Sequence, residues 1–311
     1  MMLFALALIP AIILLIYIYN RDKKEKEPTK LLVKCFCMGM VSIIPALILE
    51  IILELVLFDS GIMTQGSIAG AFVMGFVVAG LSEELFKYFM LHKLTWNNEN
   101  FDYMFDGIVY AVFVSLGFAT LENVFYVFSG GLVTALFRMI TAIPGHTCFG
   151  VYMGYYYSKT KLAEVEGNEA EYKKNKRKSL LLPMVLHGLY DALIMLDGNE
   201  VGEAVQVIAV LIWFVLVIIA FIRTFKFVNR TSKDDFHFAV IDEEVTAVYS
   251  AKMLGRWQCD CGESNESNFC PVCGKARPVE ESWVCSECGA TSYWNFCGQC
   301  GHPKEFATLE E

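Results

Sequence analysis

The sequence predicts an all-α polytopic membrane protein with about seven transmembrane helices and a small cysteine-rich tail. Three observations lead to this fold class. The 311-residue chain is 55% hydrophobic, above the roughly 45–50% of an average soluble protein. Its apolar residues form long runs, while the charged residues, 19% of the chain, are clustered between the runs. Most of the eleven cysteines lie between positions 259 and 300.

Seven apolar segments are long enough to cross a bilayer, which takes about 20 residues. We place them at roughly 2–20, 35–58, 66–91, 103–128, 132–158, 179–196 and 202–222. The first segment lacks the basic start and the small-residue cleavage site of a signal peptide, so we expect an uncleaved span.

The loops between these segments alternate in charge. Eighteen Lys and Arg residues lie in one set, at 21–34, 92–102, 159–178 and 223–233. The other set, at 59–65, 129–131 and 197–201, contains none. Because basic loops stay in the cytosol, we expect an integral membrane protein with its N-terminus outside and its C-terminal tail cytosolic.

The tail repeats a cysteine pattern, first in WQCDCGESNESNFCPVCG (257–274) and again in WVCSECGATSYWNFCGQCG (283–301). Each copy supplies four thiols as two close pairs, the donor set of a tetrahedral zinc site. A reducing cytosol disfavours disulfides as the alternative. We therefore predict two structural zinc ions in two four-cysteine zinc ribbons. Their ligands would be Cys259, Cys261, Cys270 and Cys273 in the first, and Cys285, Cys288, Cys297 and Cys300 in the second.

The sequence thus divides into a membrane-embedded core (1–228), a linker (229–256) and the two ribbons. From Trp257 onward the tail has three basic and nine acidic residues. This balance argues against binding to a nucleic-acid backbone. It favours a cytosolic protein as the partner of the ribbons.

Ionisable and polar side chains interrupt the apolar spans. A charge at the bilayer centre costs roughly 2.5–3.5 kcal/mol, so such groups usually face the interior and carry function. They are Glu83, Glu84 and Lys87 in AGLSEELFKYFM, Asp106, Glu122 and Asn123, Arg138, His146, and His187 with Asp191.

Helical geometry arranges these groups in two expected layers. At about 1.5 Å per residue, one layer near the cytosol gathers acid–base groups suited to catalysis. It contains Glu83, Glu84, His146, His187 and Asp191. A deeper layer would pair Glu122 with Arg138 on a neighbouring span.

Spacing adds detail to the first layer. Lys87 lies one helical turn from both Glu83 and Glu84, and we expect it to pair with one of them. The other glutamate would be less compensated and is a candidate general base. His187 and Asp191 are also one turn apart, so the carboxylate can fix the imidazole tautomer.

Four motifs, in order, resemble those of PrsW-type intramembrane proteases, which are distantly similar to the CAAX prenyl protease and bacteriocin-processing superfamily. They are Glu83-Glu84-x-x-Lys87, Phe118-x-x-x-Glu122-Asn123, Pro144-Gly145-His146 and His187-x-x-x-Asp191. The resemblance covers about residues 1–228 and leaves out the tail.

This resemblance implies an endopeptidase that cleaves a single-span or lipidated protein in or near the membrane. A motif glutamate, Glu83 or Glu84, would activate water; His146 would orient or protonate it; and His187 with Asp191 would stabilise the oxyanion. Lys87, Glu122, Asn123 and Arg138 would support them. A catalytic zinc on Glu83, His146 and His187 is a second possibility.

Two other classes of function compete with the protease. A membrane scaffold or receptor could use the ribbons to recruit cytosolic partners. A proton-coupled transporter would also carry intramembrane Glu and His, but transporters often show two similar halves, and no such repeat is visible.

Overall fold

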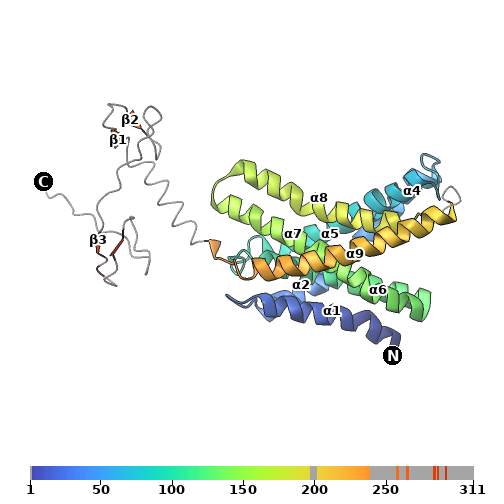
Figure 1. The fold of residues 1–311 in the computed structure, drawn as a ribbon, viewed down its shortest axis with the longest axis horizontal. Helices are drawn as coiled ribbons and strands as arrows, with labels where there is room; N and C mark the ends of the chain where they lie inside the picture. Colours follow the sequence, from blue (N-terminus) through green and yellow to red (C-terminus); the bar gives the residue numbers. More distant parts are fainter. Residues whose placement is uncertain are drawn as a thin grey trace. The chain divides into compact units, whose positions relative to one another are not determined.

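A computed structural model describes residues 2–196 and 202–238, the residue pairs 257–258, 264–265, 283–284 and 291–292, and residue 286. The chain divides into two compact units, Met1–Ala239 and Val240–Glu311. The first is a bundle of helices, and the described residues of the second form only short strands (Figure 1).

The helical unit follows the order of the apolar segments. Its elements are α1 (Met2–Arg21), α2 (Thr29–Val41), α3 (Ile43–Glu54), η1 (Leu55–Asp59), α4 (Ile68–Val73), η2 (Met74–Leu81), α5 (Ser82–Thr95), α6 (Asp106–Ile140), α7 (Ala142–Val165), α8 (Glu169–Ile194) and α9 (Glu203–Thr231). The prediction of an all-α core is confirmed.

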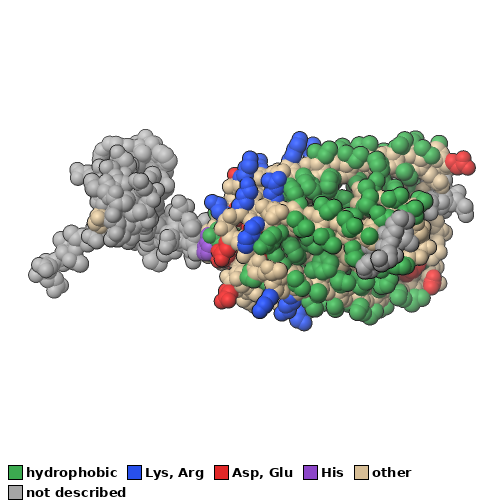
Figure 2. All heavy atoms as spheres, turned by 90° about the horizontal axis from the view of Figure 1, so that it is seen from below, with side chains coloured by type: hydrophobic (Ala, Val, Ile, Leu, Met, Phe, Trp, Pro, Cys, Tyr) green, Lys and Arg blue, Asp and Glu red, His purple; other side chains and the backbone are tan. Residues whose placement is uncertain are grey.

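Four segments are long and apolar enough to cross a membrane, namely Thr29–Asp59, Ile68–Thr95, Asp106–Val165 and Glu203–Thr231. Hydrophobic side chains cover the flank of the unit, while Lys and Arg gather at one end (Figure 2). This distribution is that of a protein whose solvent is lipid along its sides. The count of seven spans stays a prediction, because α1 is shorter in its apolar part and α8 begins with charged residues.

The segment Asp106–Val165 folds back on itself at Gly131. This glycine has φ 74° and ψ −158°, a conformation that other residues adopt only with strain. Contacts across the turn show the antiparallel pairing: Arg138 Nε donates to Asn123 Oδ1 at 3.0 Å, and Ser115 Oγ donates to the His146 carbonyl at 2.7 Å. The turn coincides with the predicted loop at 129–131.

The two glutamates of the SEEL stretch directly follow a π-helical segment. Element η2 covers Met74–Leu81, and α5 begins at Ser82. A π-helix adds a residue per turn and often occurs at functional sites. It changes the direction in which the following side chains point, so it sets which faces Glu83 and Glu84 occupy.

Close packing of η2 against α8 brings the motifs together. A Cβ on Gly75 would lie 2.6 Å from the carbonyl oxygen of Gly188, and one on Gly188 would lie 2.6 Å from the Phe76 ring. Small residues allow this close approach of backbones, as is common between membrane helices. The His187 side chain is therefore held next to the glutamates of α5.

At the basic end of the bundle, residues 232–238 pack back onto the helices. The Phe105 amide donates to Asp235 Oδ1 at 2.8 Å, and the Phe238 amide donates to the Asp102 carbonyl at 2.7 Å. Asp106 fixes the loop that precedes its helix by accepting from the Asp102 and Tyr103 amides at 3.1 and 2.6 Å, which makes it structural. Burial raises the pKa of the neighbouring Glu27 carboxyl to about 7.

In the second unit, each copy of the cysteine repeat begins with a small antiparallel pair of strands. Strand β1 (Trp257–Gln258) pairs with β2 (Ser264–Asn265), and β3 (Trp283–Val284) pairs with β4 (Thr291–Ser292). The eight predicted zinc ligands lie outside the described residues.

Candidate active site

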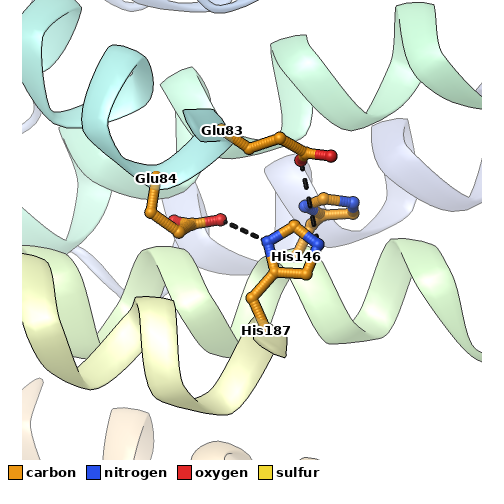
Figure 3. A group of neighbouring side chains, drawn as sticks. All are labelled: Glu83, Glu84, His146 and His187. Carbon is orange, nitrogen blue, oxygen red and sulfur yellow. Dashed lines mark hydrogen bonds and ion pairs between the residues drawn. The ribbon is translucent and has the colours of Figure 1, made fainter. Parts of the chain in front are cut away.

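Four side chains from three helical segments meet inside the helical unit (Figure 3). Glu83 and Glu84 come from α5, His146 from α7 and His187 from α8. All four are buried, with exposed fractions of 7%, 0%, 3% and 3%. Residues far apart in the sequence therefore form one polar cluster in an otherwise apolar bundle.

Lys87 stands at the centre of this cluster. Its ammonium donates to Glu83 Oε2 at 2.9 Å, to Glu84 Oε1 at 2.8 Å and to His146 Nδ1 at 3.1 Å. It also lies 4.1 Å from the centre of the Phe118 ring, a cation–π contact. The expectation that Lys87 would pair with only one glutamate is wrong, because positions i−3 and i−4 both reach the same ammonium.

His146 links this cluster to the deeper ion pair. Since lysine only donates, Nδ1 of His146 is the acceptor, and its Nε2–H donates to Glu122 Oε2 at 3.0 Å. Glu122 Oε1 in turn pairs with Arg138 at 2.9 Å. The structure places Glu122 with Arg138 as expected, but the two expected layers are one connected network.

Asn123 completes the deeper part of the network. Its side-chain oxygen accepts from Arg138 Nε at 3.0 Å, and its amide nitrogen donates to the carbonyl of Ala7 on α1 at 3.3 Å. The Arg138 guanidinium also stacks over the Tyr126 ring at 3.9 Å. These contacts hold the Arg138 side chain, which pairs with Glu122.

His187 is surrounded by carboxyl groups. Its Nδ1 lies 2.9 Å from Glu84 Oε1, and its Nε2 lies 3.2 Å from Asp191 Oδ2 and 3.8 Å from Glu83 Oε2. The Phe149 ring stacks on its face at 4.8 Å. Asp191 thus lies beside the imidazole as the i,i+4 spacing predicted.

A cavity of about 290 Å³ opens next to the cluster, and it distinguishes the two glutamates. Glu83 lines this cavity together with Phe118 and Glu122, whereas Glu84 does not. Glu84 is instead fully enclosed, and its Oε2 has no hydrogen-bond partner among the described residues. Only Glu83 of the pair is therefore placed to meet a molecule in the cavity.

One residue of the cavity wall was missing from the sequence reasoning. Glu50 on α3 lines the cavity with Glu83. The signal was present, because Glu50 and Glu54 are acidic residues inside the predicted span 35–58. They belong to none of the four motifs, so the motif pattern does not single them out.

The donor atoms of Glu83, Glu84, His146 and His187 lie within 4.8 Å of one another, close enough to suggest a metal site. The arrangement does not fit one. The Lys87 ammonium contacts three of the four residues at 2.8–3.1 Å and fills the place of the cation. Both ring nitrogens of His146 are already engaged by Lys87 and Glu122.

Comparison with known families assigns the helical unit. Residues 27–221 match the family described as "PrsW family intramembrane metalloprotease". This range contains all four motifs and the whole polar cluster, and it ends before the cysteine-rich tail.

Curated relatives agree with this match. The chain is 34% identical to a "Protease PrsW" of Geobacillus kaustophilus over 60% of this chain and 76% of the relative. It is 32% identical to that of Bacillus subtilis over 66% and 88%, and 34% identical to that of Clostridioides difficile over 68% and 87%. No solved structure matches the chain.

Proposed function

The chain belongs to the PrsW family of intramembrane proteases, and we propose that Glu83 is the base that activates water for peptide hydrolysis. It is an integral membrane protein and a peptide hydrolase; the residues that do the chemistry are the proposal. The observation that carries this assignment is that Glu83 faces the cavity while Glu84 is enclosed behind it.

In the proposed hydrolysis, one carboxylate both accepts and returns the proton. Glu83 takes a proton from a water molecule in the cavity as the water oxygen bonds to the scissile carbonyl carbon. The carbon–nitrogen bond then breaks, and Glu83 passes that proton to the leaving amine. General base catalysis by a positioned carboxylate contributes about 10²–10⁴-fold to a rate.

The neighbours of Glu83 have separate roles in this proposal. Lys87 holds the carboxylate of Glu83 in place by its 2.9 Å hydrogen bond. His187 does not line the cavity, and its Nδ1 and Nε2 lie 2.9 Å from Glu84 and 3.2 Å from Asp191. Its Nε2, 3.8 Å from Glu83 Oε2, would therefore turn from Asp191 to donate to the oxyanion that forms beside Glu83. Asp191 and Glu84 orient the His187 ring. His146 connects the Glu122–Arg138 ion pair to Lys87 through hydrogen bonds of its two ring nitrogens.

A metal ion in this site would generate hydroxide and polarise the carbonyl. We assign no step to one, because Lys87 takes the position that a cation would need among Glu83, Glu84 and His146. This part of the proposal differs from the word "metalloprotease" in the family description.

The remaining parts of the proposal concern topology and the tail. We propose seven spans with the basic loops in the cytosol, supported by the gathering of Lys and Arg at one end of the bundle (Figure 2). The eight tail cysteines would hold two structural zinc ions. The acidic ribbons would bind a cytosolic protein, and the substrate would be a single-span or lipidated protein.

Replacing His187 tests the assignment of the oxyanion donor. We expect His187→Ala to lower cleavage of a co-expressed, tagged single-span reporter by about 10²–10³-fold, as for loss of one oxyanion donor in soluble proteases. Asp191→Asn should cause a smaller loss, because it only loosens the orientation of the ring. Cleavage is measured by immunoblot of membrane fractions.

His92→Ala is the matched control, since His92 stacks on Trp96 at the far end of α5, away from the cluster. It should leave cleavage unchanged. Wild-type cleavage by a His187→Ala protein that accumulates normally would remove His187 from the mechanism.

A further inference from the structure

The wall of the catalytic cavity is acidic and apolar. Nine described residues line it, among them three glutamates, Glu50, Glu83 and Glu122, and the apolar side chains of Ile43, Leu47 and Phe118. None of these nine is Lys, Arg or His. A group that enters the cavity therefore meets carboxyl oxygens, hydrocarbon and the side chains of Tyr126 and Ser129, but no basic group.

Two of the three carboxyl groups pair with basic side chains of the protein. Glu83 accepts from Lys87 at 2.9 Å, and Glu122 accepts from Arg138 at 2.9 Å and from His146 at 3.0 Å. Glu50 differs, because it forms no hydrogen bond or ion pair with any residue in the described part of the chain. It is the uncompensated acid of the cavity.

An unpaired carboxyl group inside an apolar helix is costly. Glu50 lies on α3, within the membrane-spanning segment Thr29–Asp59, among Ile and Leu residues. Acidic residues in such segments normally find a partner or mark a ligand pathway. Since the protein supplies no described partner, the cost is offset when a ligand in the cavity supplies one.

We propose that Glu50 forms a substrate subsite that binds a basic side chain, Lys or Arg, next to the scissile bond. The subsite rests on the proposed function, because it lies in the same cavity as the base Glu83. A long basic side chain suits this wall: its hydrocarbon stem packs on Leu47 and Phe118 while its charged end reaches Glu50. The pair formed is charge-assisted and screened from water.

The rim of the cavity is accessible from the membrane. Leu47, Phe125 and Tyr126 line the cavity and are 43%, 55% and 49% exposed on the surface of the bundle. A substrate segment at this rim can insert one side chain between α3 and α6 while its backbone approaches Glu83. The preference for Lys or Arg therefore applies to a residue of the membrane-associated segment itself.

The test uses three reporters that differ at one position beside the cleavage site, which carries Lys, Leu or Glu. We expect wild-type enzyme to cleave the Lys reporter fastest. Glu50→Gln should lower kcat/KM for the Lys reporter by about 30-fold or more, as for truncation of one partner of a buried charge pair. It should leave the Leu reporter within about twofold, because the base is intact.

Reversing the charge at position 50 tests the subsite more stringently than removing it. Glu50→Lys should reverse the preference, so that the Glu reporter becomes the better substrate. Glu54→Gln is the matched control, because Glu54 lies one turn further along α3 and does not line the cavity; it should change no preference.

The outcomes separate the two proposals. If Glu83→Gln cleaves as fast as wild type, the proposed function fails. If wild type cleaves but Glu50→Gln and Glu50→Lys leave the order of the three reporters unchanged, the subsite alone is overturned. An equal loss on all reporters would make Glu50 structural and would also overturn it.

Discussion

Replacing Glu83 by Gln should abolish proteolysis while the protein still accumulates in the membrane. The amide keeps the size of the side chain and can still accept from Lys87, but it cannot take a proton from water. We expect cleavage of the single-span reporter to fall by about 10³-fold or more, the upper range for loss of a general base. The measurement is the rate of appearance of the cleaved fragment in membranes.

Glu84→Gln is the comparison that makes this prediction specific. Glu84 is fully buried, and its Oε1 accepts from both Lys87 and His187. We expect this variant to retain more activity than Glu83→Gln and to lose thermal stability instead. If Glu84→Gln were inactive and Glu83→Gln active, the roles of the two glutamates would have to be exchanged.

Replacing Lys87 by Met should cause the largest loss of stability. Lys87 is 0% exposed and is the cation nearest to both glutamates among the described residues. Removing one partner of a buried ion pair costs about 3–5 kcal/mol, because the remaining charge is left unpaired. We expect a lower melting temperature in detergent and lower accumulation in the membrane.

Lys93→Met is the matched control, since Lys93 lies on the same helix but is exposed. It should change neither quantity. A Lys87→Met protein that is as stable as the wild type would show that Lys87 does not hold the cluster. The double variant Lys87→Met with Glu84→Gln should recover part of the lost stability, because it removes one unpaired carboxylate.

Much of the site was predictable because its residues break the apolar pattern. Intramembrane charges are rare enough that Glu83, Glu84, Lys87, His146 and His187 were candidates from position alone. Spacing along one helix predicted the contact of Asp191 with His187, since i,i+4 pairs share a face. It also placed both glutamates within reach of Lys87, but the expectation that only one of them would pair with it was wrong.

The rest depended on geometry that sequence spacing does not contain. Which glutamate faces the cavity depends on the π-helical segment η2 that precedes both, and a 3.6-residue period does not predict it. The hydrogen bond between His146 and Glu122 depends on the turn at Gly131. The position of Glu50 beside Glu83 depends on the packing of α3 next to α5, which makes both residues line the same cavity.

The fold was also predictable in part from the sequence. Length and hydropathy predicted a helical membrane core, and the charge-free stretch 129–131 coincides with the turn between the two halves of Asp106–Val165. Hydropathy could not predict the packing of residues 232–238 against the loop at 101–105, because this short stretch is positioned by backbone hydrogen bonds and Asp235 as well as by the contact of Phe238 with Phe101.

In the proposed mechanism, Glu83, held by Lys87, activates water without a metal ion. The most direct test measures metal content and reporter cleavage on the same purified samples of the full-length chain and of a variant with all eight tail cysteines changed to Ser. We predict two zinc ions per wild-type chain, none in the variant, and undiminished cleavage by the variant in the presence of a chelator. One metal ion per variant chain, whose removal stops cleavage and whose return restores it, would contradict the claim.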